Sequence, residues 1–177
     1  MFRKVICFVL TLCMCMSLAA CSRSNGIGND INKKIGRFQS YDMHGKEINE
    51  SIFAEKDLTI LSVWGTFNDS YIEKLPAIAK FAEDLPDNAQ LILLACDVRD
   101  FESNEYKKAM NTIFIKNVDS AFPCMITTDS LTVFVDQFND VPATIFVDKK
   151  GNVIGEQFKG EDIAGYRAAA LEYLEGL

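Results

Sequence analysis

The most informative stretch of this sequence reads Leu58-Thr-Ile-Leu-Ser-Val-Trp64-Gly-Thr-Phe67-Asn68-Asp-Ser70-Tyr71-Ile-Glu73-Lys-Leu-Pro76. Its first part, residues 58–64, is rich in β-branched and apolar side chains and predicts a buried strand. A short polar turn follows. Beyond the turn, apolar residues recur at the spacing of an amphipathic helix: Ile72, Leu75, Ile78, Ala79, Ala82 and Leu85. The stretch therefore predicts a strand, a turn and a helix in succession.

This unit resembles the active-site element of the thioredoxin-like TlpA/ResA family, which is related to AhpC/TSA proteins and contains membrane-tethered thiol-disulfide oxidoreductases. In that family the pattern runs W-[AG]-T-W-C-x-x-C, with a proline five residues past the second cysteine. Residues 64–66, the aromatic Phe67 and Pro76 fall in register with it. The positions of the two catalytic cysteines hold Asn68 and Tyr71 instead.

The two replacements remove the chemistry of the family motif. Dithiol exchange needs a thiolate that attacks and a second thiol that resolves the mixed disulfide, and neither an amide nor a phenol does either. Ser70-x-x-Glu73 matches a capping box, and Asn68 and Asp69 are also good capping residues, so the pattern leaves the exact N-cap open. We interpret the former reaction centre as a helix cap.

The rest of the chain supports the same fold class. Residues 38–48 surround an Asp42-x-x-Gly45 turn, which predicts a hairpin and resembles the F-x-x-x-D-x-x-G-K opening of TlpA-like domains. The patterns also predict a strand at 90–96, a short apolar piece at 122–127, a short helix at 131–138, a hairpin at 141–154 and a helix at 161–177. Alternating strands and helices predict a three-layer α/β sandwich. The resemblance implies a thioredoxin-like fold with a mixed central sheet flanked by helices, and a cis Val141–Pro142 bond facing the active-site turn.

The N-terminus predicts a bacterial lipoprotein. A basic start is followed by an uncharged run of 16 residues, Val5–Ala20, which suits a signal peptide better than a membrane span of about 20 residues. The run ends Leu18-Ala-Ala-Cys21, a lipobox-like sequence; an ordinary secretory signal or an uncleaved anchor is the alternative. We expect a signal peptide at 1–20, a lipidated Cys21 with a flexible tether over 21–34, and one domain over 35–177. The expected location is the extracytoplasmic face of the cell membrane.

Composition argues against several other classes of function. Without the signal peptide, 16 basic and 25 acidic residues give a net charge of −9, which disfavours binding to nucleic acid or to an anionic membrane surface. No glycine-rich phosphate loop follows a strand, so a nucleotide site has no support. The single histidine, His44, lies in the predicted hairpin turn and is interpreted as a solvated side chain. We predict no metal and no cofactor.

Two cysteines remain outside the signal peptide and position 21. Cys96 closes a predicted central strand, and Cys124 opens the strand expected within the apolar piece at 122–127. Buried cysteines commonly behave as small hydrophobic residues. The alternative is a displaced redox pair or a single peroxide-sensing thiol, for which Arg99 is the nearest positive charge in the sequence.

The sequence leaves three functions open. The first is an accessory or binding module that captures an extracytoplasmic protein or peptide, with a groove formed by Trp64, Phe67, Asn68, Tyr71, Val141 and Pro142. The second is a thiol-disulfide oxidoreductase or peroxiredoxin-like antioxidant protein that uses Cys96, Cys124 or both. The third is a structural partner in a membrane-bound redox complex.

Overall fold

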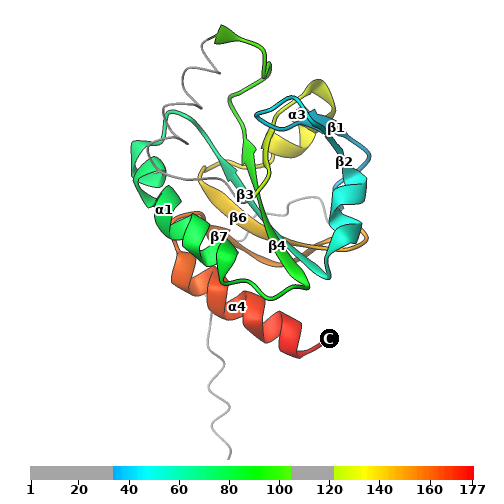
Figure 1. Cartoon of the computed structure of the whole chain (residues 1–177), viewed down its shortest axis with the longest axis vertical. Helices are drawn as coiled ribbons and strands as arrows, with labels where there is room; N and C mark the ends of the chain where they lie inside the picture. Colours follow the sequence, from blue (N-terminus) through cyan, green and yellow to red (C-terminus); the bar gives the residue numbers. More distant parts are fainter. Residues whose placement is uncertain (1–33, 105–121) are drawn as a thin grey trace, which may run out of the picture.

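A mixed sheet of five strands forms the centre of the computed structural model, which describes residues 34–104 and 122–177 (Figure 1). Its strands are β3 (Leu58–Trp64), β4 (Ala89–Ala95), β5 (Cys124–Ile126), β6 (Ala143–Asp148) and β7 (Val153–Lys159), in the order β5-β4-β3-β6-β7. The first three run parallel to one another, whereas β6 is antiparallel to β3, and β7 is antiparallel to β6. This arrangement confirms the mixed central sheet expected from the sequence.

Short elements precede and flank the sheet. The predicted hairpin is present as β1 (Gln39–Tyr41) and β2 (Glu47–Asn49), and its turn is held by the Asp42 carboxylate, which accepts the backbone N–H groups of His44 and Lys46. The helices are a 3-10 helix η1 (Glu50–Glu55), then α1 (Asp69–Glu83), α3 (Asp129–Val135) and α4 (Ile163–Glu175). The helix predicted at 131–138 therefore begins two residues earlier and ends three residues earlier than expected. The helix predicted at 161–177 begins two residues later and ends two residues earlier.

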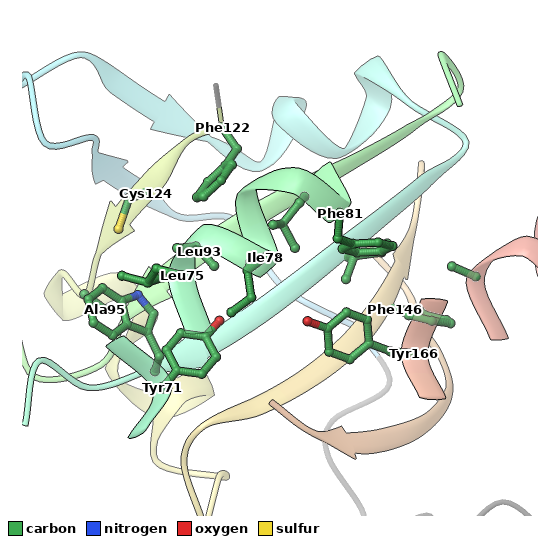
Figure 2. Close-up of a cluster of buried hydrophobic side chains, with 14 of the residues drawn as sticks. Tyr71, Leu75, Ile78, Phe81, Leu93, Ala95, Phe122, Cys124, Phe146 and Tyr166 are labelled. Carbon is green, nitrogen blue, oxygen red and sulfur yellow. The ribbon is translucent and has the colours of Figure 1, made fainter. Parts of the chain in front are cut away.

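Three layers result from the two faces of the sheet (Figure 1). Helices α1 and α4 cover one face, where Tyr71, Leu75, Ile78, Phe81 and Tyr166 pack on strand residues (Figure 2). Ala170 of α4 belongs to the same core. The hairpin, η1 and α3 cover the other face through Phe38, Ile48, Ile52, Phe53, Leu131, Phe134 and Val135. Both faces of the central strands are buried, which explains why β3 and β4 are apolar almost throughout.

Strand β3 shows how the sequence divides between these two cores. Side chains alternate along a strand, so Leu58, Ile60 and Trp64 face α1 and α4, and Leu61 and Val63 face the opposite core. The even-numbered series also contains Ser62, the polar residue nearest the end of this apolar strand. Its hydroxyl is thereby directed to the side of the sheet on which α1 lies.

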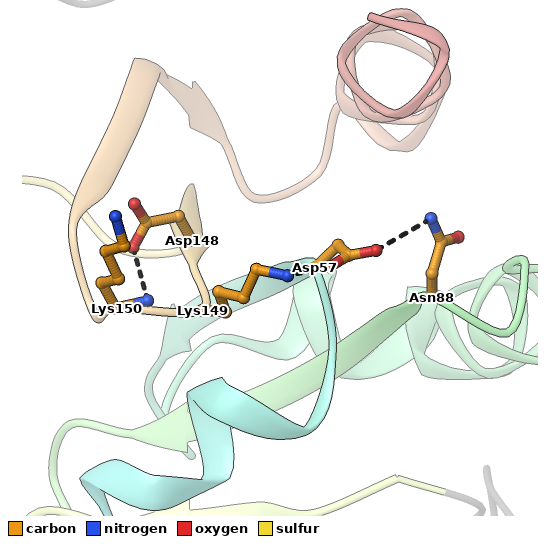
Figure 3. Close-up of polar contacts among 5 residues, drawn as sticks. All are labelled: Asp57, Asn88, Asp148, Lys149 and Lys150. Atoms are coloured by element: carbon orange, nitrogen blue, oxygen red, sulfur yellow. Dashed lines mark hydrogen bonds and ion pairs between the residues drawn. The ribbon is translucent and has the colours of Figure 1, made fainter. Parts of the chain in front are cut away.

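Polar contacts connect the segments at the end of the sheet where β3 and β4 begin (Figure 3). Lys149 Nζ lies 2.6 Å from Asp57 Oδ1, and the Asn88 side-chain amide donates to the other oxygen of Asp57 at 3.4 Å. Lys149 belongs to the β6–β7 turn, which is shaped by the Asp148 carboxylate and by Gly151 at φ +79°. Leu58 pairs with Asp148 and Val63 pairs with Ala143, so the turn that follows β3 lies at the opposite end of the sheet, next to Pro142.

Several sequence predictions lie outside the described residues. These are the signal peptide, Cys21 and the tether up to residue 33. Within 34–104 and 122–177, no helix combines the length and the apolar character that crossing a bilayer requires.

Candidate functional site

Helix α1 is capped by the residue at the position where the TlpA/ResA motif has its first cysteine. Asn68 is its N-cap, and Asn68 Oδ1 accepts the backbone N–H of Tyr71 at 3.1 Å. The cap is therefore Asn68, one of the alternatives that the sequence left open, and the Ser70-x-x-Glu73 capping box does not form because Ser70 already lies inside the helix. An amide at this position satisfies a free backbone donor of the first turn, which a thiol does poorly.

The side chain at the second cysteine position belongs to the core. Tyr71, labelled in Figure 2, is 0% exposed. Its ring packs on Trp64, also 0% exposed, with ring centroids 5.7 Å apart. The Tyr71 hydroxyl lies 2.7 Å from Ser62 Oγ, which accepts a hydrogen bond from the Thr144 hydroxyl at 3.0 Å. Burial strongly raises the pKa of the Tyr71 phenol.

This burial corrects the predicted groove. We expected Trp64 and Tyr71 to line a surface together with Phe67, but both rings are covered by α1 and the sheet and offer no surface to a partner. Phe67 is 66% exposed. Its ring lies over Gly65, where a Cβ would overlap with the Phe67 ring, so glycine at this position makes room for the aromatic side chain.

The other predicted groove residues do come together. The Val141–Pro142 peptide bond is cis, as the resemblance implied. Val141 and Pro142 line a pocket of about 430 Å³ with Asn68, Asp140, Gln157, Lys159 and Glu161, which we call the cis-proline pocket. Asn68 Nδ2 donates to the Val141 carbonyl across it at 3.4 Å.

Two further contacts fix the walls of the cis-proline pocket. The Ser70 hydroxyl, which has a single proton, lies within hydrogen-bond distance of both Asn68 Oδ1 and the Glu161 carboxylate, and so connects α1 with the segment before α4. Gly160 donates its N–H to the Pro142 carbonyl at 2.9 Å, and a Cβ at Gly160 would lie 2.5 Å from Pro142 Cβ. The close approach of these two backbones therefore requires glycine at position 160.

The turn between β3 and α1 is held by a residue that the sequence did not single out. The Asp97 carboxylate, just after β4, accepts hydrogen bonds from the Thr66 backbone N–H at 3.0 Å and from the Thr66 hydroxyl. Ser62, Gln157 and Glu161 were also missed. A serine near the end of an apolar strand was a usable signal for Ser62, because a buried hydroxyl needs a partner.

The two cysteines lie on opposite faces of the sheet. Cys124 is 1% exposed, pairs with Leu93 of β4, and belongs to the core under α1. Cys96 follows the end of β4, is half-buried and packs against the other core. Both are free thiols, and the sheet separates their side chains. The structure therefore does not bring them together as a redox pair.

The surroundings of both thiols favour the protonated form. Burial raises the pKa of the Cys124 thiol to about 12, and the nearby Trp64 indole N–H, which meets no acceptor at hydrogen-bond geometry in the described structure, offsets this only in part. Burial and the adjacent Asp97 also raise the pKa of Cys96, and Arg99 opposes that shift weakly. Thiolates are the reactive form of cysteine, so neither environment activates its thiol.

The part of the chain that the structure describes contains no candidate metal site. No group of three or more His, Cys, Asp or Glu side chains converges there in a way that would hold a metal ion. His44 is exposed in the β1–β2 turn, far along the chain from the cis-proline pocket.

No family model matches this sequence, and no curated protein matches it either. Solved structures do match. The exposed lipoprotein thioredoxin Etrx1 of Streptococcus pneumoniae has a TM-score of 0.57 at 19% identity, covering 80% of this chain and 100% of that one. The MTB protein dsbF, in its mixed oxidised and reduced forms, has a TM-score of 0.58 at 20% identity, covering 76% and 94%. Yeast mitochondrial 1-Cys peroxiredoxin has a TM-score of 0.60 at 21% identity, covering 82% and 78%.

These likenesses define the class of fold. The chain has the thioredoxin-like fold, and its structural neighbours include the thioredoxin domain of a thiol-disulfide oxidoreductase from Bacteroides vulgatus and a peroxiredoxin. Identities at this level carry the fold alone, so the function has to be argued from the residues of the site itself.

Proposed function

We propose that this chain is a lipid-anchored, extracytoplasmic thioredoxin-like protein that binds another protein or a peptide and performs no dithiol exchange. The proposed binding surface consists of Phe67, Asn68, Val141 and Pro142. It differs from the groove expected from the sequence in that Trp64 and Tyr71 support the surface from beneath.

The observation that carries this proposal is that the side chain at position 71 is buried in the core. The family motif has its resolving thiol there, whereas Tyr71 is fully buried and hydrogen-bonded to Ser62. Position 68 is likewise committed to capping α1. Both positions therefore have structural roles of their own, and an exposed aromatic side chain and a pocket lie beside them.

Exposure of Phe67 is the feature that most favours binding. Phe67 is 66% exposed, and the only other large apolar side chains that are exposed among the described residues are Val133, Leu171 and Leu177. Phe67 is the one that adjoins the cis-proline pocket through its neighbour Asn68. Aromatic side chains with a polar rim are frequent anchors of protein interfaces.

The membrane anchor is proposed from the sequence. The run Val5–Ala20 followed by Cys21 supports lipidation after signal cleavage. The pneumococcal neighbour is itself described as an exposed lipoprotein thioredoxin. A Cys21→Ser variant should lose a labelled fatty acid in cells and leave the membrane fraction; retention of both would contradict lipidation at this residue.

Site-specific crosslinking tests the proposed surface. A photo-crosslinking amino acid replaces Phe67 in one version of the protein and Val133 in the other; Val133 is 73% exposed but lies on α3, on the opposite face of the sheet. We expect a discrete partner adduct from position 67 in cells and none from position 133. Equal adducts from both positions, or none from position 67, would contradict the proposal.

One observation keeps thiol chemistry as a second candidate. Cys96 is half-buried rather than closed off, and its backbone N–H donates to the Trp64 carbonyl at 2.8 Å, close to the turn that begins at Gly65. A peroxiredoxin-like role would require this single thiol to react with peroxide. Its raised pKa argues against such a role. Peroxide consumption that disappears in a Cys96→Ser variant would establish it.

A further inference from the structure

An irregularity in β7 places a polar side chain in the cis-proline pocket. Thr144 of β6 pairs with Phe158, but Phe146 pairs with Ile154, so residues 155–157 of β7 lie opposite Ile145 alone. Gly155, at φ +68°, allows this bulge. Bulges redirect side chains and are common beside functional sites. This one ends at Gln157, which lines the pocket together with Pro142.

Gln157 is a buried polar side chain without a full set of partners. It is 6% exposed, and its carbonyl oxygen Oε1 has no hydrogen-bond donor among the described residues. An unsatisfied buried acceptor of this kind is costly, and native structures contain few of them. Rotation about the last torsion of a glutamine side chain is broad. The amide can therefore turn its oxygen towards a donor that enters the pocket.

The remaining polar groups of the pocket are mostly acceptors too. Asp140 and Glu161 contribute two carboxylates, against the single ammonium group of Lys159. The Ser70 hydroxyl can donate its single proton either to Glu161 or to Asn68 Oδ1, and Asn68 Oδ1 also accepts the backbone N–H of Tyr71. A ligand group that matches this lining supplies N–H donors and positive charge.

From this geometry we infer that the cis-proline pocket selects a basic side chain, lysine or arginine, of the bound protein or peptide, with Gln157 Oε1 and the carboxylates of Asp140 and Glu161 as its acceptors. This inference rests on the proposed function, since it names the residue type that the binding surface takes. The binding is non-covalent, and the acidic balance of the chain, 25 acidic against 18 basic residues, favours the approach of a basic partner.

Labelled peptides test the inference on the full-length chain in detergent micelles. The probes are fluorescein-labelled heptapeptides Gly-Ser-Ala-X-Ala-Ser-Gly in which X is lysine, norleucine or glutamate, and the readout is fluorescence anisotropy. Norleucine keeps the aliphatic stem of lysine without its charge. We expect the lysine peptide to bind about tenfold more tightly than the norleucine peptide, as for one charge-assisted hydrogen bond, and the glutamate peptide to bind most weakly.

Two substitutions of Gln157 test whether its side chain is the source of the preference for lysine. Gln157→Met has nearly the same shape without the acceptor, and should reduce binding of the lysine peptide by about tenfold. Gln157→Glu should increase the preference for lysine, because it adds a negative charge. Gln39→Met is the matched control: Gln39 is exposed on β1, outside the pocket, and its replacement should leave the preference unchanged. Thermal unfolding confirms that each variant is folded.

The outcomes separate this inference from the proposed function. Equal binding of the lysine and norleucine peptides overturns the inference and leaves peptide binding in place. A lysine preference that survives in Gln157→Met overturns the assignment of Gln157 as its acceptor. If no peptide binds and the crosslinking at position 67 also fails, both the proposed function and the inference are contradicted.

Discussion

The hydroxyl oxygen of Tyr71 lies 2.7 Å from that of Ser62, in a fully buried site at the first turn of α1. Ser62 also lies 3.0 Å from Thr144 Oγ1, its cross-strand neighbour. One side chain at the second cysteine position thus connects α1 to two strands of the sheet. Because buried hydroxyl groups must find partners, Tyr71 and Ser62 depend on each other.

Removing the Tyr71 hydroxyl should be a mild change and removing its ring a severe one. Tyr71→Phe loses one hydrogen bond while Ser62 keeps Thr144, so the free energy of unfolding should fall by about 1 kcal/mol. Tyr71→Ala leaves a large cavity, and the fall should reach about 3–5 kcal/mol. Urea denaturation measures both. Phe67→Ala is the surface control and should stay within about 0.5 kcal/mol; a loss as large as that of Tyr71→Ala would show that Phe67 is also part of the core.

Asn68 should contribute to stability mainly as a cap. Asn68→Ala removes the acceptor of the Tyr71 backbone N–H and the contact with the Val141 carbonyl, so the free energy of unfolding should fall by about 1 kcal/mol. Asn68→Asp keeps a good N-cap and should lose much less. Aspartate cannot donate the hydrogen bond that Asn68 Nδ2 gives to the Val141 carbonyl. Equal losses in the two variants would therefore mean that this hydrogen bond, and not the cap, is the main contribution of Asn68 to stability.

The sequence was sufficient for the fold and for part of the site. Strand β3 has the predicted bounds, and the hairpins and the cis Val141–Pro142 bond are present. Two of the six predicted groove residues, Trp64 and Tyr71, lie in the core instead. The family resemblance places both residues near the active-site turn, but it does not say how deeply α1 and the sheet cover their rings.

Gln157 could not have been found from the sequence alone. In a regular β7 its side chain would be placed by strict alternation, and the bulge opposite Ile145 breaks that alternation. The separation of Cys96 and Cys124 by the sheet could not be found from the local pattern either. Alternation along β4 and β5 already places Cys96 and Cys124 on different faces, once it is known that Leu93 pairs with Cys124. That register depends on tertiary pairing, which the local pattern does not contain.

The unsatisfied amide of Gln157 should limit stability. Gln157→Met removes a buried acceptor that has no donor, so the free energy of unfolding should rise by about 1 kcal/mol. Gln90→Met is the matched control, because the Gln90 amide donates to the Ile52 carbonyl at 2.8 Å and to Thr59 Oγ1 at 2.9 Å. That substitution should be destabilising. A destabilised Gln157→Met variant would show that Gln157 is satisfied in solution.

Cys124 should make the protein less stable at alkaline pH. Its thiol has a pKa of about 12 in the folded protein and about 8.5 in an unfolded chain. Between these values the unfolded chain loses a proton that the folded protein keeps, so stability falls as pH rises, by up to about 1.4 kcal/mol per pH unit. Comparing chemical denaturation of the wild type and Cys124→Ala from about pH 8.5 to 10, below the ordinary tyrosine range, isolates this effect. Parallel pH profiles would contradict the assigned pKa.

The most direct test of the account is to count thiols in residues 22–177 after equilibration in dithiol redox buffers, by alkylation and mass measurement. Cys96 and Cys124 are separated by the sheet, and both have raised thiol pKa values. We therefore predict two thiols at every potential, with Cys124 labelled only after denaturant is added. Reversible conversion of the two thiols into one intramolecular disulfide at a physiological potential would contradict the loss of redox function.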